Sequence, residues 1–104
     1  MRPGIHALSK ILANLHAKHN ITVNAICPGN ILTKRQEDLN RSRAAEKKVA
    51  LEEYLGEAAR QIPAERFGRP DEIGSVVAFL ASERASYING INLLVDGGLV
   101  KTVN

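Results

Sequence analysis

The chain has 104 residues, of which 44% are hydrophobic and 24% are charged, and its net charge is +3 at pH 7. This length gives one domain in the usual range of about 100–200 residues, and the composition is globular rather than disordered. The single cysteine and the lack of tryptophan exclude a disulfide framework and a cysteine-based zinc site, indicate an aliphatic, alanine-rich core, and suit a reducing, cytoplasmic setting.

Residues 3–18 are predicted to form a helix that begins at Pro3, a residue suited to the first helical turn. Apolar side chains recur there at helical spacing, at Ile5, Leu8, Leu12 and Leu15. The histidines of this segment, His6, His16 and His19, do not form the pair at i and i+4 that holds a metal on one helix face. No metal site is therefore expected. No part of the sequence stays apolar over the about 20 residues that a membrane span needs.

Residues 21–27, ITVNAIC, are predicted to form a strand, because valine, isoleucine and threonine favour extended backbone. Apolar side chains occur on both faces, which is typical of an inner strand of a parallel sheet. Cys27 is interpreted as a small packing residue of this strand. Pro28 and Gly29 end the strand, and open α/β sheets bind their ligands at the carboxyl ends of strands.

The segment after this strand is long and charged. Residues 30–45 lack periodicity, and residues 46–61 are predicted to form a weakly apolar helix. Such a segment favours a mobile lid over a core element. The basic side chains between residues 34 and 48 could also bind nucleic acid phosphates. Interleaved acidic residues, and the lack of aromatic side chains for base stacking, favour a solvated surface instead.

The last third contains a second strand preceded by a helix. RFGRP is predicted to be a loop, and Pro70 begins a helix over residues 70–81 whose first turn is acidic, as the helix dipole favours. Residues 91–95, INLLV, are predicted to form a strand that an Asp-Gly-Gly turn ends. Strand, helix and strand in this order predict a right-handed parallel crossover. Two strands leave open edges and uncovered faces, so a larger sheet is expected.

Two blocks of this sequence form a pattern that is highly specific for one protein family, because they occur in this order and are separated by a charged segment. They are ITVNAICPGNILT and RFGRPDEIGSVVAFLASERASYINGINLLVDGG. They resemble the C-terminal portion of the short-chain dehydrogenase/reductase family, in its 3-oxoacyl-carrier-protein reductase or sugar-dehydrogenase type. The resemblance extends from about Arg2 to Gly98. It implies an α/β fold, the C-terminal part of a Rossmann-type doubly wound parallel sheet, with the last two strands, flanking helices and a lid. One partial domain would then comprise residues 1–33, a substrate lid at 34–61, and the last helix and strand at 62–104.

The resemblance also implies cofactor-binding residues in the loop after the first strand, at Pro28, Gly29, Ile31 and Thr33. A backbone group of Ile31 and the hydroxyl of Thr33 would hold the nicotinamide carboxamide of NAD or NADP, since a hydroxyl can both donate and accept. Gly29 would let the backbone approach the ring closely. The alternative interpretation of Thr33 is a cap of the segment that follows it.

Parts of the family pattern are missing from these residues. The sequence has no glycine-rich phosphate loop, and the catalytic serine and tyrosine of the family have no counterpart in it. Alignment with the family pattern places Arg2 at the position of the family lysine. Either the complete protein carries arginine there, or Arg2 belongs to a divergent start and this register is coincidental. No catalytic residue is assigned. Arginine keeps the charge of lysine but not its geometry.

The function expected from the resemblance is that of the C-terminal half of an NAD(P)-dependent oxidoreductase. In the complete fold, hydride would pass between the nicotinamide and a small-molecule carbonyl or alcohol. The isolated chain is expected to be inactive and to bind the cofactor weakly or not at all. The alternative is a non-catalytic, truncated or degenerate assembly module. The expected partner is a second copy, in a dimer or tetramer, in the cytoplasm, with no nucleic acid and no membrane.

Overall fold

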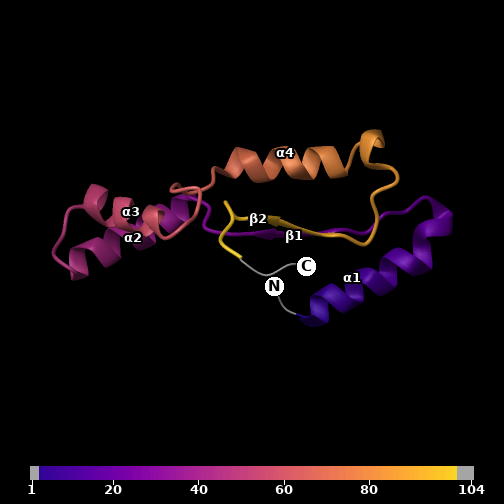
Figure 1. The fold of residues 1–104 in the computed structure, drawn as a ribbon, viewed down its shortest axis with the longest axis horizontal. Helices are drawn as coiled ribbons and strands as arrows, with labels where there is room; N and C mark the ends of the chain where they lie inside the picture. The colour runs from indigo at the N-terminus through magenta and orange to yellow at the C-terminus, as the bar shows by residue number, and fades with distance from the viewer. Residues whose placement is uncertain (1–2, 101–104) are drawn as a thin grey trace.

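A computed structural model describes residues 3–100 of the chain (Figure 1). In chain order its elements are α1 (Pro3–His16), a 3-10 turn (Ala17–His19), β1 (Ala25–Pro28), α2 (Lys34–Glu46), α3 (Leu51–Arg60), α4 (Pro70–Leu80), a second 3-10 turn (Glu83–Ala85) and β2 (Asn92–Val95). None of these helices is both long and apolar enough to cross a membrane.

The sheet consists of β1 and β2, which pair in parallel with Ala25 opposite Asn92 and Pro28 opposite Val95. The helix α4 runs along one side of this pair, and α1 lies on the other side (Figure 1). The predicted α/β class and the parallel pairing are therefore confirmed. Within residues 3–100 the sheet has two strands, so each strand keeps an unpaired edge.

The predicted strand over residues 21–27 is too long, because β1 begins only at Ala25. Asparagine side chains replace the strand ladder before it. The Val23 N–H donates to Asn89 Oδ1 over 2.9 Å, and the Ile91 N–H donates to Asn24 Oδ1 over 3.1 Å. The two segments still lie side by side here, since the Gly90 N–H donates to Val23 O over 2.9 Å. The amide groups thus take the place of part of the backbone ladder and interrupt the regular pairing.

The segment expected to lack periodic structure after β1 forms a helical hairpin, which projects beyond the sheet (Figure 1). The helix α2 has no apolar stripe, but its lysine, arginine, glutamine and glutamate residues favour helix, and Thr33 caps its N-terminus. The predicted helix over 46–61 is interrupted, because Lys48 has a left-handed φ of 57° and α3 begins at Leu51. The predicted helix over 70–81 and strand over 91–95 are confirmed to within one residue by α4 and β2.

The core is small. Among residues 3–100, the buried apolar residues are Ala13, Ala44, Ile62 and Ala85, which agrees with the predicted aliphatic, alanine-rich core. The radius of gyration is 17.0 Å, whereas a compact domain of this length has about 13 Å. The apolar residues of α1 are largely uncovered, with Ile5, Leu8, Ile11 and Leu15 each more than half exposed. An exposed apolar row of this kind is typical of surfaces that bind other protein.

Candidate functional site

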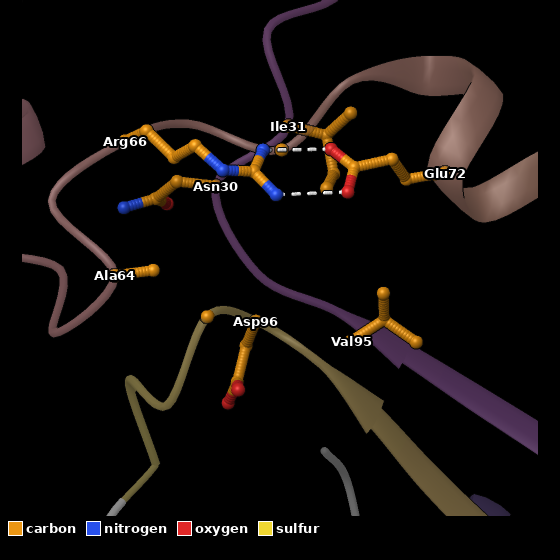
Figure 2. Close-up of a pocket in the computed structure, with 9 residues that line it drawn as sticks. Asn30, Ile31, Ala64, Arg66, Glu72, Val95 and Asp96 are labelled. Carbon is orange, nitrogen blue, oxygen red and sulfur yellow. Dashed lines mark hydrogen bonds and ion pairs between the residues drawn. The ribbon is translucent and has the colours of Figure 1, made fainter.

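The carboxyl ends of β1 and β2 converge with the loop before α4 around a cavity of about 60 Å³ (Figure 2). Side chains from all three segments line it, among them Ile31, Arg66, Glu72 and Asp96. Small-molecule sites usually have about 300–1,000 Å³. The cavity is therefore smaller than the usual small-molecule site.

Gly29 fits the close approach of the two strand ends. Its N–H donates to Val95 O over 3.0 Å, and a Cβ at this position would come within 2.6 Å of Asp96 Cβ and 2.8 Å of Asp96 Cα. Packing of β1 against β2 thus requires glycine at this position, independently of any approach to a ring.

The turn after β2 is held by Asp96, whose carboxylate accepts hydrogen bonds from the N–H groups of Gly98 and Val100, each over 3.0 Å. Gly97 and Gly98 adopt φ values of 64° and 88°, which glycine tolerates without strain. The Gly97 carbonyl accepts from the Ala64 N–H over 3.0 Å. In the sequence, aspartate before two glycines already indicates such a turn.

Ile31 forms a parallel bridge with Gly68. The Gly68 N–H donates to Asn30 O over 3.0 Å, and the Leu32 N–H donates to Gly68 O over 2.9 Å. In a strand the N–H and C=O of successive residues point to opposite edges, so those of Ile31, between Asn30 and Leu32, face away from Gly68. The Ile31 carbonyl accepts from the Thr33 N–H over 2.9 Å, whereas no group within residues 3–100 accepts from the Ile31 N–H.

Thr33 is the N-cap of α2, and its Oγ1 accepts from the Gln36 N–H over 3.2 Å. The capping interpretation is therefore confirmed. A hydroxyl has two lone pairs and one hydrogen, so the cap leaves one lone pair and the hydrogen of this exposed side chain available. Pro28 ends β1, and all four predicted cofactor residues thus lie on one short connection from β1 to α2. Arg2 lies outside the described residues.

Sequence reasoning missed the ion pair between Arg66 and Glu72, which both line the cavity and face each other (Figure 2). The guanidinium donates two hydrogen bonds, of 2.8 and 2.9 Å, to the two carboxylate oxygens. Glu72 also accepts from the Arg69 N–H over 3.0 Å. Hydrogen bonds from Arg66 and then from that N–H lower the pKa of Glu72 from 4.5 to about 2. The pair therefore contributes stability above pH 4.5 and loses this contribution as the pH falls toward about 2.

The hairpin of α2 and α3 carries a shallow groove of about 310 Å³, where the Lys47 ammonium lies 5.5 Å from the ring centre of Tyr54. Cys27 lies half-buried in β1. Within residues 3–100 there is no group of three His, Cys, Asp or Glu side chains that could hold a metal ion.

Known proteins share this arrangement. The model of the family described as "Enoyl-(Acyl carrier protein) reductase" matches residues 1–100. The 2-dehydro-3-deoxy-D-gluconate 5-dehydrogenase of Escherichia coli K12 is 39% identical over 93% of this chain and 35% of its own length. A short-chain dehydrogenase family protein from Francisella tularensis matches with a TM-score of 0.85 at 30% identity, over 92% of this chain and 40% of its own. The L-sorbose reductase of Gluconobacter frateurii, in complex with NADPH and L-sorbose, matches with a TM-score of 0.88 at 37% identity, over 96% of this chain and 38% of its own. The chain thus spans about a third of the length of the curated relatives it matches.

Proposed function

The chain belongs to the short-chain dehydrogenase/reductase family, and from this membership we propose that it forms the C-terminal part of an NAD(P)-dependent oxidoreductase. In the whole enzyme, hydride would pass between the nicotinamide and a small carbonyl or alcohol. The observation that carries the proposal is the connection from β1 to α2, at the carboxyl end of the sheet, where the Ile31 N–H has no acceptor within residues 3–100.

The hydrogen-bonding groups of this connection fit a carboxamide. The Ile31 N–H is a donor for the amide oxygen, and the remaining lone pair of Thr33 Oγ1 is an acceptor for the amide NH₂. Pro28 and Gly29 fix where this connection leaves β1, through the bond from the Gly29 N–H to Val95 O. A bound nicotinamide would give or accept the hydride, and these residues would orient its ring.

The hairpin of α2 and α3 is proposed as the substrate lid. It follows the connection that would hold the cofactor, and its two helices pack mainly on each other, with Asn40 and Ala44 buried between them. A segment attached to the rest of the chain by few contacts can move without disturbing the sheet. The groove beside Tyr54 gives it a partly aromatic surface.

Chimeras test the cofactor role. The matched segment of the E. coli enzyme is replaced by this chain from Pro3, so that the relative keeps its own residue at the position of Arg2. We expect the chimera to transfer hydride. Thr33→Ala should raise its KM for the cofactor about fivefold, because the loss of one hydrogen bond costs about 1 kcal/mol.

Thr33→Ser is the matched control, because it keeps both the hydroxyl and the cap, and its KM should stay within twofold. A chimera that begins at Arg2 tests whether arginine at that position lowers kcat. Equal cofactor KM values for the alanine and serine variants would contradict the proposed role of Thr33. A folded chimera without hydride transfer would contradict the proposed function as a whole.

The exposed face of α1 favours a second candidate, a non-catalytic assembly module. Leu8 is 55% exposed in a row of similarly uncovered apolar side chains. We expect the chain to self-associate, so that its mass by light scattering rises with concentration. Leu8→Lys should shift this equilibrium toward the monomer, because the lysine charge would have to be buried. Asn14→Lys, at an exposed polar position of the same helix, should not.

If the unmodified chain stays monomeric at high concentration, self-association is ruled out. The two candidate functions are distinguished by the chimera, because an assembly module would associate but would not support hydride transfer.

A further inference from the structure

The connection from β1 to α2 is held in place by hydrogen bonds to the backbone of Gly68. Residues Asn30 and Leu32 form backbone hydrogen bonds with Gly68, one on each side of Ile31. A Cβ on Gly68 would come within 2.6 Å of Ile31 Cδ1, so the two segments are in close contact. The direction of the Ile31 N–H is therefore set by where Gly68 lies.

The position of Gly68 is in turn set by Glu72. Arg66, two residues before Gly68, donates two hydrogen bonds to the Glu72 carboxylate and one of 3.1 Å to Phe67 O. The Arg69 N–H, directly after Gly68, donates to the same carboxylate. Glu72 lies in the first turn of α4. The loop is thus fixed to the helix on both sides of Gly68 by a single carboxylate.

The geometry points to a positioning role: we propose that the Arg66–Glu72 ion pair holds the Ile31 N–H in place for a nicotinamide carboxamide, without itself touching the cofactor. The identity of the ligand rests on the proposed function. The structural half of the inference, that the ion pair fixes the position of the Ile31 N–H, does not. The chain of contacts runs from Glu72 through Gly68 to Ile31, from α4 to the end of β1.

Exposed ion pairs usually contribute little to stability, with a median of about 0–1 kcal/mol. This pair differs in geometry, because both carboxylate oxygens accept from one guanidinium, and such paired bonds fix direction as well as distance. The Glu72 side chain is 29% exposed and that of Arg66 is 54% exposed. By contrast, the neighbouring pair of Arg69 and Asp71 has one bond, of 3.1 Å, and both side chains are more than 60% exposed.

The test compares Glu72→Gln with Asp71→Asn in the 104-residue chain. Both changes remove one negative charge from the first turn of α4, but only the first removes the paired bonds. We expect Glu72→Gln to speed amide hydrogen exchange at Leu32 and Gly68 about tenfold by local opening, and Asp71→Asn to change it less than about twofold. The Ala25 amide, which donates to Ile91 O in the sheet, serves as the reference and should be unaffected.

Arg66→Lys provides a second variant, because lysine keeps the charge without the bidentate geometry, and its exchange rates should be intermediate. In the chimera defined above, Glu72→Gln should raise the KM for the cofactor about fivefold with kcat little changed. A purely structural role would leave that KM unchanged in the folded enzyme.

Unchanged exchange at Leu32 and Gly68 in Glu72→Gln would overturn the positioning role. The same would follow if Ala25 exchanged faster by the same factor, since the pair would then only support the whole fold. Faster loop exchange with an unchanged cofactor KM in an active chimera would overturn the link to the cofactor. An inactive chimera would contradict the proposed function, while the exchange rates would still decide the structural half.

Discussion

Replacing Gly29 by alanine is expected to destabilise the chain by about 3 kcal/mol or more, at the upper end of what overpacking costs. The new Cβ would lie 2.6 Å from Asp96 Cβ and 2.8 Å from Asp96 Cα. Because one of these atoms belongs to the backbone, no side-chain rotation relieves the contact. The strand ends must separate, which weakens the bond from the Gly29 N–H to Val95 O. Urea unfolding followed by circular dichroism measures the effect.

Gly74→Ala is the matched control. A Cβ at Gly74 would meet no atom within 4 Å, and the residue lies within α4. Alanine there should stabilise the chain by about 0.5–1 kcal/mol, because glycine is a poor helix former. Equal unfolding midpoints for Gly29→Ala and Gly74→Ala would show that the strand ends are not as close as described.

The sequence predicted best where local signals and tertiary packing agree. Pro70 at the first helical position, followed by an acidic turn, located α4 almost to the residue. The strand β2 was found because apolar residues precede an Asp-Gly-Gly turn. In both cases one element's own residues determine its ends, so no distant contact is needed to predict them.

Prediction failed where a partner far along the chain decides the outcome. The first strand is shortened by Asn24 and Asn89, whose side chains bond to backbone more than 60 residues away. The helix α2 lacks an apolar stripe, so periodicity did not detect it. The pairing of Arg66 with Glu72 spans a loop and matches no helical or strand spacing. Gly29 was singled out as a cofactor-binding residue. In the structure, glycine is needed at this position because Asp96 leaves no room for a Cβ, and the two residues are adjacent only in the folded sheet.

Produced on its own, the 104-residue chain is expected to show no dehydrogenase turnover and no useful affinity for NAD(H) or NADP(H). Most of the affinity for a dinucleotide in this fold comes from a pyrophosphate at a helix N-terminus and from a ribose contact. The N-terminus of α4 is unsuited to phosphate, since Asp71 and Glu72 occupy its first turn. The sequence has no glycine-rich phosphate loop.

The remaining carboxamide contacts, from the Ile31 N–H and the Thr33 hydroxyl, are worth about 1–3 kcal/mol as two hydrogen bonds, whereas a Kd of 1 mM already requires about 4 kcal/mol. Proton transfer also lacks the tyrosine and lysine that the family places four residues apart, because the residues four positions after Tyr54 and Tyr87 are Ala58 and Ile91. An absorbance assay with NADH and NADPH against a panel of ketones, beside calorimetry with each cofactor, measures both expectations. Micromolar affinity, or turnover that persists in Thr33→Ala, would show that the chain contains a cofactor site other than the connection from β1 to α2.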